Sequence, residues 1–330
     1  MAKTKSQGAQ RSRAARPVDA EQRSRVLLIG GVVAVILVAL GFIGFGWYQT
    51  QIKPLSKTVL RVGETKFSLA HLERRMELER QQNPFYAQPQ QQVILADAVF
   101  QRLEQEAKLL EAAEQLDISV TEEEIANEIK QRGNLAEEAG EKVYGFELAR
   151  QVEASGLGVN EYQQMLRAEL LELKVRDYFT FLAPSSEPQV HARWIAVSDE
   201  ARAEEALQRL DAGEDFAAVA REESEDVGTA EEGGDLGWRP RGGFPDEEME
   251  DFLFEEAQPG QHSEVLSTVL GLYIVQLVEP EQDRELDEVL RSTVVAREMT
   301  EWLEGLDNTL DVERDFTAED RDKALRDVIL

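Results

Sequence analysis

The longest uninterrupted apolar stretch of the chain extends from Val26 to Tyr48 and contains no charged residue. A helix rises 1.5 Å per residue, so residues 26–48 are long enough to cross a hydrocarbon core of about 30 Å. The stretch ends in Trp47 and Tyr48, and such aromatic side chains favour a membrane interface. A cleaved signal peptide is an alternative, but its apolar region spans about 7–15 residues and no small-residue cleavage site follows Tyr48. A buried core helix is the other alternative. The pattern predicts a single transmembrane helix over residues 26–48.

The charge on the two sides of this stretch predicts an orientation. Residues 1–25 contain two acidic side chains and seven basic ones, namely Lys3, Lys5, Arg11, Arg13, Arg16, Arg23 and Arg25. Basic flanks stay in the cytoplasm. We therefore expect a basic cytoplasmic tail over residues 1–25 of a single-pass protein of the cell membrane. Residues 49–330 are expected to be extracytoplasmic.

Helical spacing dominates the segment that follows. The alternation in residues 59–67 predicts a hairpin, and Ser68 is placed to cap a helix that ends near residues 83–84. Thr121 begins a capping-box pattern, Asn160 is expected to cap a long helix, and residues 184–188 are typical of a linker. A further helix is predicted after the Gln-rich residues 88–92, with its apolar face formed by Val93, Ile94, Ala98, Leu103, Leu109 and Leu110.

The periodicity changes after residue 188. A strand is predicted over residues 190–197, helices over 199–211, 214–222 and 246–256, and two short strands around Gly271. A Gly-rich loop is expected up to Gly243. Helical patterns return over residues 286–306 and 317–328. The fold class is therefore α+β, with a small antiparallel sheet and its helices inserted between two helical segments that form one domain.

Charge and composition exclude several functions. The 330 residues include 65 acidic and 36 basic side chains, a net charge of −29. Subtracting the +5 of residues 1–25 leaves −34 on the rest, which repels phosphate backbones, so no nucleic-acid binding is expected. The absence of cysteine and the presence of only three histidines argue against a metal site. The acidic runs 122–124 and 246–248 lack calcium-loop spacing and are typical of solvated helix N-termini.

Four motifs occur in order in the middle segment. They are HARWIAV at 191–197, GEDFAAVA at 213–220, SED at 224–226 followed by GGDLGW at 233–238, and PG at 259–260 followed by TVLGLYI at 268–274. Their order and spacing resemble the parvulin (PpiC-type) peptidyl-prolyl isomerase domain over residues 188–281. Residues 49–187, with the phrase SVTEEEI, are similar to the helical SurA N-terminal chaperone domain. The stretch WLEGLDNTLDVE at 302–313 resembles the returning C-terminal helix of SurA- and PrsA-type proteins, and the C-terminal helices over residues 282–330 are expected to pack on the chaperone domain. With its predicted anchor, the chain resembles the PpiD and PrsA-like extracytoplasmic foldases.

The resemblance also implies a site. Asp226 occupies the Cys/Asp position that faces the substrate amide. Trp194 and Tyr273 stand where the family has a histidine pair, and His191 and His262 are expected to be exposed at the surface. The implied substrate-binding residues are Leu236, Phe244, Met249, Phe254 and Thr268, although ordinary core packing explains such apolar residues equally well. The stretch between Phe244 and Met249 is one residue longer than in the family.

Isomerisation of an X–Pro bond breaks no bond, so neither cofactor nor metal is expected. The amide barrier is about 18–20 kcal/mol, and a catalyst needs an apolar proline pocket and polar groups that favour the twisted amide. We predict a foldase that isomerises X–Pro bonds in exported or non-native polypeptides. A holdase that binds chains without turnover is the alternative, with Phe85, Tyr86, Tyr162 and Phe179 as candidate contacts. A membrane scaffold is a third hypothesis with no specific support.

Overall fold

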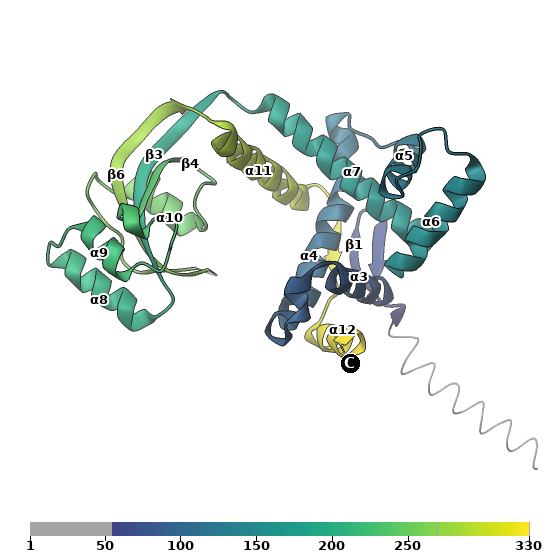
Figure 1. Ribbon diagram of the computed structural model, residues 1–330, viewed down its shortest axis with the longest axis horizontal. Helices are drawn as coiled ribbons and strands as arrows, with labels where there is room; N and C mark the ends of the chain where they lie inside the picture. Colours follow the sequence, from purple (N-terminus) through teal and green to yellow (C-terminus); the bar gives the residue numbers. More distant parts are fainter. Residues whose placement is uncertain (1–54, 269, 330) are drawn as a thin grey trace, which may run out of the picture. The chain divides into compact units, whose positions relative to one another are not determined.

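The computed structural model describes residues 55–268 and 270–329 (Figure 1). The predicted cytoplasmic tail and transmembrane helix lie outside these residues. Within the described ranges, no helix combines the length and the apolar character that a membrane crossing requires. The expectation of a mixed helical and sheet fold is confirmed by two separate sheets and the helices around them.

A three-stranded sheet begins the described chain. Strands β1 (Thr58–Val62) and β2 (Thr65–Ser68) form the predicted hairpin, and β7 (Val312–Arg314) pairs antiparallel with the other edge of β1. Helix α3 (Leu69–Gln82) follows, and its N-cap Ser68 accepts a hydrogen bond from the backbone N–H of His71, as predicted. The sheet thus joins the first and last parts of the described chain.

The helical segment contains α4 (Pro89–Ala112), α5 (Glu122–Arg132), α6 (Glu141–Ser155) and α7 (Val159–Leu182). The capping box at Thr121 and Glu124 is present as predicted. Helix α7 is capped by Gly158 rather than Asn160, because Glu161 accepts a hydrogen bond from the Gly158 N–H and so starts the helix earlier. Short 3₁₀ turns, Pro84–Ala87 and Ala113–Leu116, flank α4.

The apolar face of α4 differs from the prediction. Val93 and Ile94 are 65% and 47% exposed. The side chains of α4 that enter the core are Leu95, Ala96, Val99, Leu103, Ala107, Leu109 and Ala112. Because apolar residues occur on all sides of this helix, its periodicity alone does not identify the buried stripe.

The C-terminal helices α11 (Glu288–Gly305) and α12 (Ala318–Ile329) pack on this helical segment. Met299 and Leu303 of α11 join a core with side chains of α5 and α7, and Ala324 of α12 joins a second core with β1, α3 and α4. The chain therefore leaves the helical segment at α7 and returns to it at α11.

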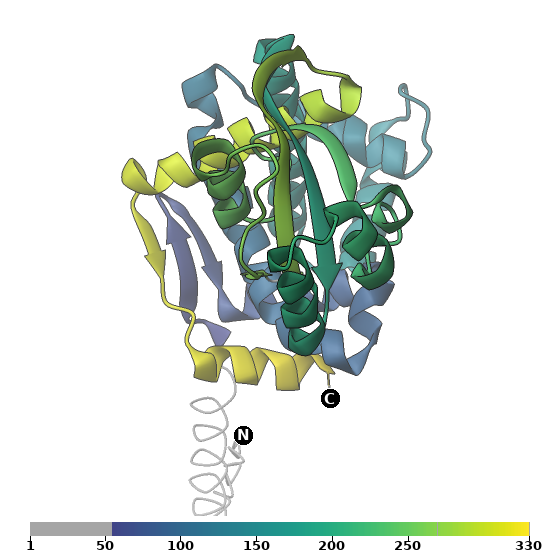
Figure 2. The same cartoon turned by 90° about the vertical axis from the view of Figure 1, so that its left-hand side faces the viewer.

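Between these helices lies a four-stranded antiparallel sheet in the order β4-β3-β6-β5. The strands are β3 (Ser186–Val197), β4 (Asp235–Pro240), β5 (Leu266–Thr268) and β6 (Gly271–Glu285). Figures 1 and 2 show β3 and β6 side by side along their length. The sheet is accompanied by α8 (Glu200–Asp211), α9 (Phe216–Glu223), the 3₁₀ turn Ala230–Glu232, and α10 (Glu247–Asp251) with its π-helical continuation Phe252–Glu256.

Two predictions for this sheet were wrong. Residues 235–240 form β4 where a loop was expected, and β3 starts at Ser186 where a linker was expected. Both strands depend on partners distant in sequence, because Gln189 pairs with Pro240 and Ser186 pairs with Glu285. Pro188 lies in β3 at a point where β3 pairs with β6 alone, because the pairing with β4 begins at Gln189. A proline is tolerated there because that edge of β3 needs no backbone N–H.

Candidate active site

One face of the four-stranded sheet gathers most of the predicted site residues. Val190, Ala192 and Trp194 of β3 contribute to one apolar cluster, while Ile195 and Val197 contribute to the cluster on the opposite face. The first cluster contains Tyr273, Phe244, Met249, Trp194, Leu236 and Phe254. Six of the eight predicted residues thus meet at a single apolar surface, three of them from strands β3, β4 and β6 and three from the loop, α10 and π-helical turn that follow β4.

Asp226 connects to this cluster through Trp194. The indole Nε1–H of Trp194 donates to Asp226 Oδ2 at 2.7 Å, and the hydroxyl of Thr229 donates to the same oxygen at 2.6 Å. The backbone N–H of Gly228 donates to Oδ1 at 3.0 Å. The ring of Tyr273 lies 5.3 Å from that of Trp194 with an interplanar angle of 51°. The three proposed polar residues thus form one connected group, and Thr229 is a member that the sequence did not indicate.

Gly234, the second glycine of the GGDLGW motif, contacts this group through the backbone of Trp194. Gly234 has a φ of +78°, and its carbonyl accepts a hydrogen bond from the Trp194 N–H at 2.9 Å. A Cβ on Gly234 would lie 2.1 Å from the Trp194 carbonyl oxygen. Glycine is therefore required here, because the loop approaches the β3 backbone too closely for any side chain.

The surroundings shift the pKa values of Asp226 and Tyr273 in opposite directions. Burial raises the pKa of Asp226, but hydrogen bonds from Thr229, Trp194 and Gly228 outweigh burial and hold that pKa below its usual range. Burial, together with the charge of Asp226, raises the pKa of Tyr273. At neutral pH the site therefore contains a carboxylate beside a protonated phenol.

The apolar residues differ in how much surface they present. Met249 is fully buried and Phe244 is 8% exposed, whereas Leu236 and Phe254 are half-buried. The guanidinium of Arg241 lies 4.6 Å from the ring centre of Phe254. A ligand meeting this face would first contact the half-buried side chains, with Met249 behind them.

Thr268 does not belong to the cluster. Its hydroxyl accepts a hydrogen bond from the Leu270 N–H at 3.0 Å and donates to the Gly271 carbonyl at 3.2 Å, both within the turn between β5 and β6. The structure therefore gives this residue a turn-forming contact.

Two histidines expected at the surface are half-buried instead. His191 Nε2 lies 2.8 Å from Asp235 Oδ1, and the His191 ring lies 5.6 Å from the ring of Trp238. His262 Nδ1 lies 3.0 Å from the Ser263 carbonyl oxygen. The expectation was wrong because pairing with β4 covers His191, and because His262 forms an isolated bridge with Gln276 of β6 and its Nε2 lies 3.7 Å from Asp211 Oδ1. Neither ring is among the Asp226 hydrogen-bond donors.

The four candidate holdase contacts occupy different environments. Tyr162 is buried, and its hydroxyl donates to Gln151 Oε1 at 2.7 Å. Phe179 packs half-buried, with its ring 6.1 Å from that of Trp302. Phe85 is exposed and Tyr86 half-buried. Among residues 55–268 and 270–329, no three His, Asp or Glu side chains are arranged to hold a metal ion.

Family comparisons divide the chain into two recognised parts. Residues 21–176 match the model of the SurA-like N-terminal domain, and residues 195–279 match the model of the PPIC-type PPIASE domain. Both expected family resemblances, and with them the parvulin type of the isomerase domain, are thereby confirmed.

The curated relatives are foldases and a chaperone. The chain is 32% identical to foldase protein PrsA of Geobacillus sp. strain WCH70, over 52% of this chain and 60% of the relative. It is 29% identical to foldase protein PrsA of Geobacillus kaustophilus, over 64% and 74%. It is 41% identical to the periplasmic chaperone PpiD of Escherichia coli, over 30% of this chain and 15% of that protein. The aligned region thus spans only part of each relative.

Proposed function

We propose that this protein isomerises X–Pro bonds in non-native polypeptides. The chain joins a SurA-like N-terminal domain to a PPIC-type isomerase domain and is homologous to the PrsA and PpiD foldases. The observation that carries this proposal is the group formed by Asp226, Trp194 and Tyr273 at the edge of an apolar cluster. An apolar surface beside a fixed carboxylate is what this reaction requires.

The mechanism follows from that arrangement. The proline ring packs against Leu236 and Phe254, with Phe244 and Met249 behind them, which removes water from the peptide carbonyl. A twisted amide has less charge separation than a planar one, so an apolar environment favours the transition state over the ground state. The negative charge of Asp226 opposes charge on the carbonyl oxygen and adds to this preference.

Trp194 and Tyr273 have separate roles in this proposal. Trp194 holds Asp226 in position through its indole N–H and offers its ring as one wall of the pocket. Tyr273 supplies a second wall beside that ring, and its hydroxyl remains uncharged. Thr229 is a positioning residue, because it acts on the substrate only through Asp226.

We further propose that residues 26–48 anchor the protein in the cell membrane and that residues 49–330 act outside the cytoplasm on exported chains. The uncharged run and its basic flank support this, as does the similarity to a protein named a periplasmic chaperone. The helical segment would hold the client. A cavity of about 540 Å³ among α4, α7 and α11, with Val295, Met299 and Leu303 among its lining residues, is large enough for apolar side chains.

A holdase without turnover is the second candidate. One observation favours it, namely that both carboxylate oxygens of Asp226 already accept hydrogen bonds from the protein itself. Such a carboxylate is less available to a substrate amide.

A prolyl isomerisation assay on the full chain in detergent micelles separates the two candidates. Catalysis above the uncatalysed rate, reduced at least about tenfold by Leu236→Ala, would support the isomerase, because truncation removes a wall of the apolar pocket. Leu207→Ala is the matched control, since Leu207 packs half-buried in the cluster on the opposite face of the sheet. An aggregation assay on the same samples completes the test. Suppressed aggregation without isomerisation would establish the holdase instead.

A further inference from the structure

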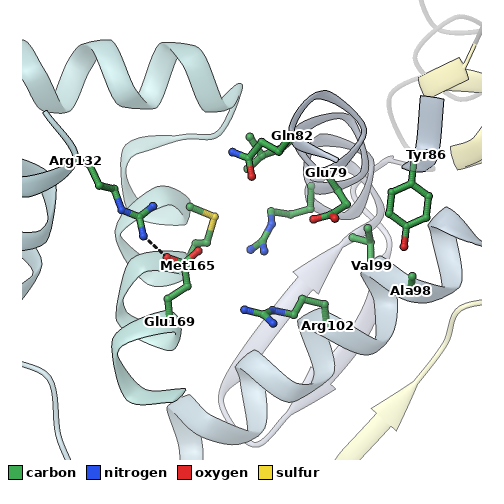
Figure 3. A pocket seen from close by; sticks show the side chains of 11 residues that line it. Glu79, Gln82, Tyr86, Ala98, Val99, Arg102, Arg132, Met165 and Glu169 are labelled. Atoms are coloured by element: carbon green, nitrogen blue, oxygen red, sulfur yellow. Dashed lines mark hydrogen bonds and ion pairs between the residues drawn. The ribbon is translucent and has the colours of Figure 1, made fainter. Parts of the chain in front are cut away.

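A second cavity lies in the SurA-like domain, away from the cluster proposed for isomerisation. It has a volume of about 360 Å³ and is lined by residues of α3, α4, α5 and α7, together with Tyr86 of the turn Pro84–Ala87 (Figure 3). Five charged side chains line it, namely Arg75, Glu79, Arg102, Arg132 and Glu169. A ligand would interact most strongly with a charged lining residue that has no ion-pair partner in the protein.

The three arginines of the cavity are already neutralised. Each forms at least one ion pair with a carboxylate at 3.4 Å or less, and the pair of Arg75 is buried and bidentate, with distances of 2.8 and 2.7 Å. The pairs are Arg75 with Glu106, Arg102 with Glu106 and Glu172, and Arg132 with Glu128 and Glu169. The guanidinium charge is therefore fully compensated before any ligand arrives.

Glu79 lies in the same cavity without such compensation. Its carboxylate accepts a hydrogen bond from Asn83 Nδ2 at a long 3.3 Å, and no Lys or Arg of the described residues forms an ion pair with it. Figure 3 shows Glu79 between Tyr86 and the arginine side chains of the cavity. Its charge is felt by its neighbour, because burial and Glu79 together raise the pKa of Tyr86. Among the charged side chains that line the cavity, Glu79 is therefore the one without an ion pair in the described residues.

We propose that this cavity binds a lysine or arginine side chain of a client polypeptide, with Glu79 as its counter-ion. The ring of Tyr86 lines the same cavity and offers a face for a cation, and the amide of Gln82 can hydrogen-bond to the client backbone. The inference rests on the proposed function only in taking the client to be a polypeptide.

The charge of the whole protein supports a cationic client segment. A net charge of −29 raises the local concentration of basic segments and speeds their encounter, in a salt-dependent way. The volume of about 360 Å³ accommodates one basic side chain with part of its backbone. An anionic group would instead meet guanidiniums that already form ion pairs with carboxylates, beside the carboxylate of Glu79.

The test measures binding of dye-labelled, proline-free peptides to the full chain in micelles by fluorescence anisotropy. The peptides are identical except for one central residue, which is lysine, arginine, norleucine or glutamate. We expect the lysine and arginine peptides to bind about three- to tenfold more tightly than the norleucine peptide, and Glu79→Gln to abolish that difference. The matched control is Glu77→Gln, on the same helix, because Glu77 is already bound by Arg80 and Gln81.

Each result decides the proposal. Equal binding of the lysine and norleucine peptides, or a preference that survives Glu79→Gln, would overturn it. Tighter binding of the glutamate peptide would show that the arginines recognise an anion and would also overturn it. A parallel isomerisation assay separates this inference from the proposed function, because Glu79→Gln should leave turnover of a short proline peptide unchanged. If the protein does not isomerise proline bonds, it could still bind the lysine peptide more tightly than the norleucine peptide.

Discussion

The indole N–H of Trp194 donates to the carboxylate of Asp226 at 2.7 Å, at a position where the family resemblance implies an imidazole. A tryptophan donates one hydrogen bond and accepts none, so it cannot share a proton with its partner as histidine does. The carboxylate consequently remains ionised and fixed.

Replacing Trp194 with phenylalanine keeps an aromatic ring and removes the hydrogen bond to Asp226. A hydrogen bond to a charged group contributes about 1.5–3 kcal/mol, so the free energy of unfolding should fall by that amount in urea titrations. The control is Trp238→Phe, because the Trp238 ring is held by the cation–π contact with Arg284 at 4.2 Å. An equal loss in both variants would contradict the assigned role of the Trp194–Asp226 bond.

Gly234→Ala should be far more damaging than Gly213→Ala. Both glycines have a positive φ, +78° and +87°, so both substitutions incur about 1–2 kcal/mol of backbone strain. Only at Gly234 would the new Cβ collide with the backbone, whereas nothing lies within 4 Å at Gly213. Thermal unfolding should show an additional loss of more than about 2 kcal/mol at Gly234. Equal melting temperatures would show that the loop can move away from β3.

Glu161 gives the helical segment a pH-dependent stability. Burial alone would raise its pKa, but hydrogen bonds from Gly158, Arg74 and His71 lower the pKa to about 2. Because the folded-state value lies below the unfolded one, this contribution is present above pH about 4.5 and is lost as the pH falls towards 2. Glu161→Gln should lower stability by about 1–3 kcal/mol at pH 7. Urea unfolding at pH 7 and pH 2.5 should show this deficit shrinking with acidity, and a constant deficit would contradict the assignment.

Removing one partner of the buried pair of Arg75 and Glu106 should cost more stability than removing both. Arg75→Met leaves Glu106 buried with only the 3.4 Å contact to Arg102, and breaking a buried pair in this way costs about 3–5 kcal/mol. The double substitution Arg75→Met with Glu106→Leu removes both charges and should recover most of that loss. A double-mutant cycle by chemical unfolding measures the difference. No recovery would indicate that packing rather than charge explains the single-variant loss.

Local signals were predictable from the sequence, whereas contacts made at a distance were not. Ser68 and Thr121 act as predicted caps, because capping depends on residues only three positions away. Strand β4 was missed, because it follows directly on Gly233 and Gly234 and itself contains Gly237, which are typical of a loop, and because the strand exists through its pairing with β3. Family motifs located Trp194 and Asp226, but not the hydrogen bond between them. Thr229 was missed since a hydroxyl three residues after a carboxylate has no distinctive pattern.

The pairing of β7 with β1 has a consequence for the order in which the protein is made. Residues 312–314 complete a sheet begun by residues 58–68, so that sheet cannot close until nearly the whole chain has been synthesised. The sheet formed by β3, β4, β5 and β6 uses only residues 186–285 and can close earlier. Contacts so distant in sequence form slowly. During synthesis the sheet of the first domain therefore stays incomplete while the sheet of the second can already be closed, so the apolar residues of β1 and β2 stay without their third strand for longer.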